Sequence, residues 1–272
     1  MLLVSGFRGS AAPQDPPGTA ALVALASAYV RDYQQQLTAI VADETYHQEI
    51  RTQVPRDRGM PDKRTMKGEI FFWFTPGSDW MAIRDVVEVD GRTPHDRPDL
   101  RAALRLGETM QVAAAFKAHN ARYNLGHITR NFNEPTLGLL VLDDRHRGRF
   151  TFVRGRTDRR GGETLVTLTF RERGRDTLIR GLDGTPVPSR GEVTLEVNSG
   201  RITRTLLAAT IGKVQVTMST SYGHEPRLDM WVPERFGERY RDGAPGLVPY
   251  EDIQGEATYA NFRRFEVLTR IR

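Results

Sequence analysis

The chain has no cysteine among its 272 residues. Within this chain, that absence excludes disulfides, a thiol nucleophile, cysteine-ligated zinc and a lipobox acylation site. The sequence also lacks any apolar run close to the roughly 20 residues that a membrane-spanning helix needs. Thiol chemistry and a helical membrane span are therefore not expected.

The usual catalytic and metal-binding motifs are also missing. No two of the six histidines stand four residues apart on a predicted helix, as a zinc site on a helix would require; they are His47, His95, His119, His127, His146 and His224. No serine lies in a Gly-x-Ser-x-Gly elbow. Gly155, Gly161 and Gly162 fall between predicted strands and not before a helix, which argues against a phosphate-binding loop. We expect no cofactor, no metal and no catalytic residue.

One group of carboxylates could still suggest hydrolytic chemistry. Asp85, Glu88 and Asp90 lie close together in the sequence, but Arg84, Arg92 and Arg97 are interleaved with them. This pattern favours salt-bridged strand ends over a catalytic pair. Dispersed carboxylates that meet only in the fold stay open, and with them a hydrolase.

The charge is modestly basic and scattered. Lys and Arg exceed Asp and Glu by 39 − 34 = 5, without a dense basic tract, which is typical of an arginine-rich composition more than of a nucleic-acid footprint. On a strand, the segment NFRRFEV would put Phe262 and Arg264 on one face and Arg263 and Phe265 on the other. No base-stacking platform results, and we expect no nucleic-acid partner.

The first 18 residues differ from the rest. A short apolar start is followed by Ser10-Ala11-Ala12 and then by a proline-rich stretch. This order resembles the end of a secretion signal with cleavage near Ala12, although the signal is incomplete. We expect residues 1–18 to be a leader or a disordered segment, and the protein to be periplasmic or secreted.

A helix and many strands follow. Apolar residues three or four apart predict a helix from Thr19 to about Ala42, and a strand is expected over Thr45–Val54. Two short helices are predicted within 98–123. Residues 136–142 are apolar but too short to assign. From Arg149 onward every predicted element is a strand, at 149–154, 164–171, 192–197, 201–210, 213–222, 228–231 and 255–267.

The strongest strand signal is a hairpin between Lys67 and Arg97. Its strands, Glu69–Thr75 and Trp80–Val89, flank a Pro76–Asp79 turn. Both faces of the first strand are apolar, which predicts that both sides are covered. The surplus of large apolar side chains either fills a core or lines a cavity for a hydrophobic ligand. The candidate cavity-lining residues are Phe72, Phe74, Trp80, Met81 and Ile83.

Nothing divides the chain cleanly, so we expect one domain over residues 19–272, with a helical insert at about 98–123. The order of features resembles a known family. Phrases such as GEVTLEVNSGRITRT and LDMWVPERFGERY are similar to those of the half-barrel family of bacterial envelope proteins that includes the lipoprotein carriers LolA and LolB. The resemblance implies an α+β fold: a strongly curved, mainly antiparallel, incomplete β-barrel whose concave face is covered by helices.

Three functions follow as hypotheses. The first is a non-enzymatic envelope protein that binds a lipid or acyl chain in the half-barrel, as the resemblance implies. The second is a structural or protein-interaction module with a filled core, whose partner is another envelope protein. The third is the hydrolase with dispersed carboxylates. Whether the concave face is open or plugged separates the first two.

Overall fold

The computed structural model describes residues 17–52, 62–74, 81–106, 109–130, 134–181, 183–243 and 250–265. Ten strands form one antiparallel sheet, in the order β3-β2-β1-β12-β11-β10-β9-β8-β5-β4, and the sheet is curved without closing into a barrel. Its strands are β1 (Ile40–Thr52), β2 (Lys63–Trp73), β3 (Met81–Val89), β4 (Phe150–Arg160), β5 (Glu163–Glu172), β8 (Arg190–Glu196), β9 (Ile202–Ile211), β10 (Val214–Glu225), β11 (Met230–Asp242) and β12 (Glu251–Arg264). The expected fold class, an α+β incomplete barrel, is confirmed.

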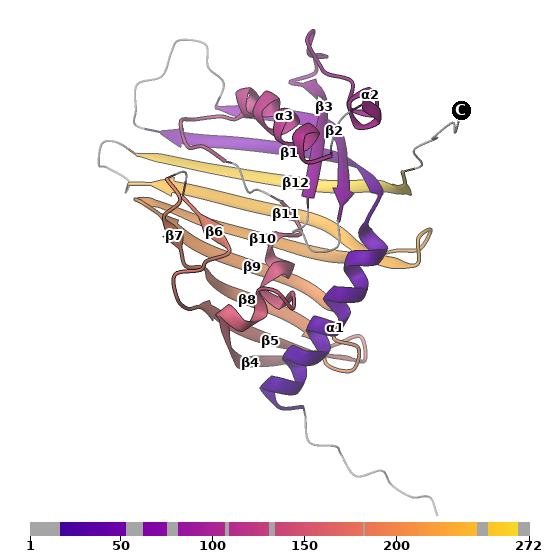
Figure 1. The fold of residues 1–272 in the computed structure, drawn as a ribbon, viewed down its shortest axis with the longest axis vertical. Coiled ribbons are helices and arrows are strands. Elements are labelled where there is room, and N and C mark those ends of the chain that lie inside the picture. Colours follow the sequence, from indigo (N-terminus) through magenta and orange to yellow (C-terminus); the bar gives the residue numbers. More distant parts are fainter. Residues whose placement is uncertain are drawn as a thin grey trace, which may run out of the picture.

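The remaining elements are short except for one. The long helix α1 (Thr19–Leu37) crosses in front of the strands from the β4 side toward β1, while α2 and α3 lie beside β3 (Figure 1). The others are α2 (Leu100–Leu106), α3 (Thr109–Asn120), the 3-10 helices η1 (Ala121–Tyr123), η2 (Leu137–Leu142) and η3 (Arg147–Arg149), and a small hairpin of β6 (Ile179–Arg180) and β7 (Pro186–Val187). No helix in the described ranges is long and apolar enough to cross a bilayer.

Most of the predicted elements are present, with shifted ends. The first helix stops at Leu37 and not near Ala42, because Ala39 adopts φ +56 and the β-branched Ile40 and Val41 begin β1. The segment that periodicity could not assign is the 3-10 helix η2. The strand expected over 228–231 is longer, since β11 runs on to Asp242.

The β2–β3 hairpin is covered on both faces, as its sequence predicted. Phe72 pairs with Ala82, and Phe71 with Ile83, so neighbouring residues point to opposite sides. Phe72 enters the main core beneath α1. Phe71 and Ile83 instead join a second core completed by α2 and α3; its buried members are Val41, Phe71, Ile83, Leu100, Val112 and Phe116.

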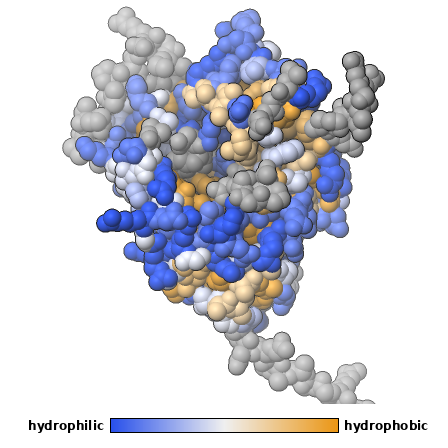
Figure 2. All heavy atoms as spheres, in the orientation of Figure 1, coloured by the Kyte–Doolittle hydropathy of each residue, from blue (hydrophilic) through white to orange (hydrophobic). Residues whose placement is uncertain are grey.

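The surface of the helix-bearing side has apolar areas at two places. Figure 2 shows them over α3 and over the N-terminal half of α1, with a band of hydrophilic residues between. On α1, the outward residues Ala20, Ala21 and Ala24 are exposed. The first half of α1 is therefore apolar on its outer side as well as its inner side.

Candidate functional site

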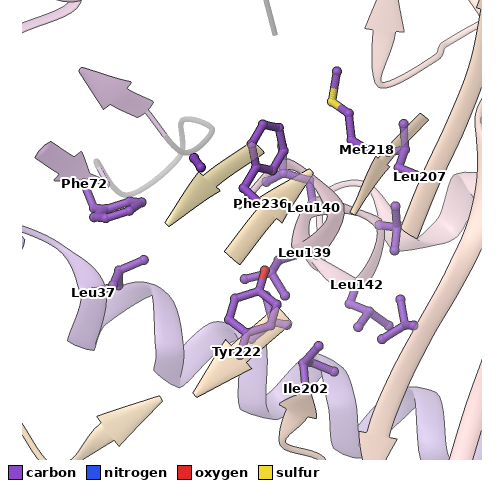
Figure 3. Close-up of a cluster of buried hydrophobic side chains, with 14 of the residues drawn as sticks. Leu37, Phe72, Leu139, Leu140, Leu142, Ile202, Leu207, Met218, Tyr222 and Phe236 are labelled. Carbon is purple, nitrogen blue, oxygen red and sulfur yellow. The ribbon is translucent and has the colours of Figure 1, made fainter. Parts of the chain in front are cut away.

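The concave face of the sheet is filled, chiefly by α1 and η2. The inner side of α1 is almost wholly excluded from water, at Leu22, Ala26, Val30, Tyr33 and Leu37. Leu139, Leu140 and Leu142 of η2 point into the same core, where they meet Tyr222 and Phe236 from the strands (Figure 3). One N-terminal helix thus covers a continuous apolar surface of the sheet.

A two-residue link, called the hinge below, joins α1 to β1. Only Thr38 and Ala39 separate the two elements, and Ala39 holds a left-handed conformation that a non-glycine residue adopts at some cost. The Thr38 hydroxyl donates to the carbonyl oxygen of Phe74 and accepts from the Phe74 amide, at 3.1 and 2.9 Å. The hinge is therefore fixed to the end of β2.

Two polar contacts hold the middle of α1 to the loop that follows η2. The buried Gln34 side chain donates to Asp143 at 2.6 Å, and the exposed Arg31 pairs with Asp144 at 2.6 Å. The α1 interface also contains an unsatisfied polar group: the buried Ser27 hydroxyl has no hydrogen-bond partner in the described structure. Such a group costs about 1–3 kcal/mol, which lowers the free energy needed to detach the helix.

The Gln34–Asp143 contact should respond to acid. Burial alone would raise the pKa of Asp143, but hydrogen bonds from Arg145 and Gln34 together outweigh it and hold that pKa at about 2. Because the folded-state pKa is depressed, the stabilisation is fully present above the unfolded value near 3.8 and is lost as pH falls toward 2.

We therefore expect α1 to loosen between pH 4 and pH 2. Amide exchange in residues 19–37 should accelerate over this range relative to residues of β10. The variant Asp143→Asn should lack this acid-dependent step. An identical pH profile in the variant would contradict the assignment to Asp143.

Beside the apolar core, the same face carries a buried polar network. Arg130 has a fully buried side chain that lies 3.5 Å from Glu238 and donates to Gln48 at 2.6 Å. Glu238 accepts hydrogen bonds from the hydroxyls of Tyr46 and Tyr240. Burial raises the pKa of both tyrosines well above the usual value, so they stay protonated as donors. A β-carbon at Gly255 would lie 2.4 Å from the Tyr46 hydroxyl oxygen, so glycine is required there.

A small cavity adjoins this network, between α3 and β3. Its volume is about 50 Å³, and its charged lining consists of Arg84, Lys117, Arg130 and Glu134. Burial raises the pKa of Glu134, which lies 3.6 Å from Lys117. Pockets for small molecules usually measure about 300–1,000 Å³. This cavity has room for a few water molecules and not for an acyl chain.

The four candidate ligand contacts that the structure describes do not meet around one cavity. Phe72 is fully buried beneath α1, and its ring lies 6.5 Å from that of Tyr259. Phe74 is partly buried at the α1 hinge. Ile83 and Met81 belong to the second core on the opposite face, and Trp80 lies outside the described residues, as does the Pro76–Asp79 turn. A role of these five residues in ligand binding stays a prediction.

The hairpin carboxylates form ion pairs, but of the three interleaved arginines only Arg97 pairs with one of them in the described part of the chain, and Arg84 pairs with Glu44 instead. Asp85 pairs with Arg97 at 2.7 Å, while Glu88 and Asp90 pair with Lys67 and Arg64. Burial raises the pKa of Asp85 even though Arg97 opposes it. Within the described ranges, no three His, Asp or Glu side chains gather as a metal site would require.

Arg130, Glu238 and Gln34 were not identified as functional candidates from the sequence. Arg130 lies in an irregular segment, and Glu238 is one of many alternating residues in GERYRD. A signal was available only for Glu238. A charged residue that alternates in phase with buried aromatic residues on a strand faces the core. Glu238 stands between Phe236 and Tyr240 in that phase.

Comparisons with known proteins return similarity in structure only. No protein-family model matches the chain, and no curated protein matches it. A domain from Vibrio parahaemolyticus described as an outer membrane lipoprotein-sorting protein domain aligns over 90% of this chain and 93% of its own, with a TM-score of 0.42 and 8% identity. A DUF1329 family protein from Desulfovibrio piger aligns over 92% and 94%, with a TM-score of 0.38 and 10% identity.

A further similarity is weaker. The structure of a Pseudomonas aeruginosa MucA/MucB complex aligns over 89% of this chain and 99% of that chain, with a TM-score of 0.20 and 9% identity. The suspected resemblance to half-barrel envelope proteins agrees with the first of these similarities. At such identities and TM-scores they concern the fold, and the function is argued below from this chain's own residues.

Proposed function

We propose that the chain is a non-enzymatic protein of the bacterial envelope that binds a hydrophobic ligand, such as a lipid acyl chain, on the concave face of its half-barrel. In the proposed mechanism α1 acts as a lid that the ligand displaces. The envelope setting follows from the sequence resemblance. The observation that carries the proposal is the continuous apolar surface beneath α1, a single helix that precedes the sheet in the chain.

Three features of α1 favour its being a movable lid and not a permanent part of the core. It connects to the sheet through the two-residue Thr38-Ala39 link. No side chain caps its N-terminus, and its first and last turns lack charges that would favour the helix dipole. The unpartnered Ser27 hydroxyl lies in its interface. The link keeps α1 attached to the sheet when the helix is displaced, while the uncapped N-terminus and the Ser27 hydroxyl lower the cost of exchanging α1 for a ligand of similar apolarity.

A change in the Gln34 contact tests the proposal. Gln34→Ala removes a hydrogen bond to a charged partner, worth about 1.5–3 kcal/mol, that exists only while α1 is closed. The open population should rise, and the apparent affinity for a ligand of the open state should rise with it, by about tenfold or more. Titration of the full chain with a fluorescently labelled C16 fatty acid measures this affinity.

The matched control is Gln36→Ala, which changes the same residue type at an exposed position of the same helix. It should bind as the wild type does. Equal affinity in both variants would count against α1 as the lid, and the absence of fatty-acid binding by all three proteins would overturn the proposed function.

A second candidate, an interaction module with a filled core, is favoured by one observation. The cavity between α3 and β3 is only about 50 Å³, far below the volume of ordinary ligand sites. For such a module, the fatty acid would bind neither the wild type nor the Gln34→Ala and Gln36→Ala variants, and α1 would stay packed on the sheet.

A further inference from the structure

The face of the sheet that α1 does not cover carries a row of hollows across its strands. One of about 480 Å³ lies over β4, β5, β8 and β9, and one of about 400 Å³ lies over β9 to β12. A hollow of about 180 Å³ connects them, because it shares Leu206 with the first and Ser219, Gly237 and Glu256 with the second. Together they make a trough that runs perpendicular to the strands.

The middle of the trough's floor is made of uncharged residues, two of which are small. Leu206 pairs with Ser219, and Ser219 with Gly237, so these three form one row across β9, β10 and β11. All three are half-buried and point away from the helix-covered core. The row continues to Glu192 on one side and to Glu256 on the other. From Glu192 to Glu256 it spans four strand spacings, or about 19 Å.

Arginines stand on both sides of this floor. In the neighbouring row on one side, Arg204 and Arg235 flank Ser221. In the neighbouring row on the other side, Arg171 pairs directly with Arg190. All four are exposed, and none has a salt bridge within the part of the chain that the structure describes. Two arginines directly opposite each other on neighbouring strands destabilise a sheet unless an anion compensates them.

We infer that this trough is the docking site for an acidic amphipathic helix of a partner protein. The unpaired arginines supply the charge complementarity, and the small floor residues let a helix approach closely. A length of about 19 Å corresponds to about 13 helical residues. An extended peptide lying across strands would find the sheet's backbone groups already paired, whereas a helix satisfies its own.

The glutamates at the ends of the floor favour an acidic helix over other anionic partners. Glu192 and Glu256 are exposed and would repel a continuous polyanion such as nucleic acid. A flat anionic membrane would contact the arginine side chains but could not fill the hollows between them. A helix with acidic flanks and an apolar ridge meets both requirements.

The test uses the full chain and a defined probe. The probe is a labelled helical peptide of about 14 residues, with Leu and Ala along one face and Glu on both flanks, and binding is followed by fluorescence anisotropy. The double change Arg204→Gln and Arg235→Gln should weaken binding about fivefold or more and reduce its salt dependence. A matched double change, Arg105→Gln with Arg175→Gln, removes two exposed arginines elsewhere and should alter affinity less than about twofold.

A change of shape without charge completes the test. Ser219→Tyr fills the floor and should reduce affinity by about tenfold, since an aromatic ring occupies the space of the helix ridge. Equal losses from the two arginine pairs, equal binding of a scrambled peptide of the same composition, or binding to anionic vesicles in place of the peptide would overturn the inference. Failure here leaves fatty-acid binding beneath α1 unaffected, because the two sites lie on opposite faces of the sheet.

Discussion

Replacing Glu238 with alanine is expected to lower the free energy of unfolding by about 3–5 kcal/mol. The change leaves the guanidinium of Arg130 buried without its anionic partner. It also removes the acceptor for the hydroxyls of Tyr46 and Tyr240. Urea unfolding of the full chain, followed by far-UV circular dichroism, measures the loss.

Two further variants distinguish the effect of breaking the buried ion pair from the effect of removing a charge in general. Asp144→Ala breaks the exposed pairs with Arg31 and Arg147 and should cost less than about 1 kcal/mol. The double change Arg130→Met with Glu238→Leu removes both buried charges and should recover at least half of the loss caused by Glu238→Ala. A Glu238→Ala variant within about 1 kcal/mol of the wild type would show that the network contributes little.

The hairpin shows what could be predicted from the sequence and why. Alternation places Phe72 on one face and Phe71 on the other, and the structure covers both faces. Periodicity of two is a local property of a strand, so the residues alone reveal it. The identity of the two covers is not local. Nothing near residue 72 indicates that α1 lies over it while α2 and α3 lie over Ile83.

The polar contacts were beyond sequence reasoning for the same reason. Gln34 and Asp143 are 109 residues apart, and Tyr46 and Glu238 are 192 apart. Such pairs depend on strand order and on where a helix crosses the sheet. The end of α1 was also misplaced, because the left-handed Ala39 gives no compositional signal of the kind that glycine would give.

The central claim, that α1 and a hydrophobic ligand compete for the concave face, predicts a large change in the accessibility of α1. Because the chain has no cysteine, a single introduced thiol reports without background. Ala26→Cys places it on the fully buried side of α1, and Ala20→Cys places it on the exposed side. A cysteine is only slightly larger than alanine, so the packing of α1 should survive the first change.

Thiol labelling of these two variants, with and without saturating C16 fatty acid, is the most direct measurement of the claim. A buried thiol reacts only from the open state, so its rate follows the population of that state. The account predicts that fatty acid accelerates labelling of the Ala26→Cys variant by about tenfold or more and leaves the Ala20→Cys variant unchanged. Labelling of Ala26→Cys that stays equally slow with and without the ligand would contradict it.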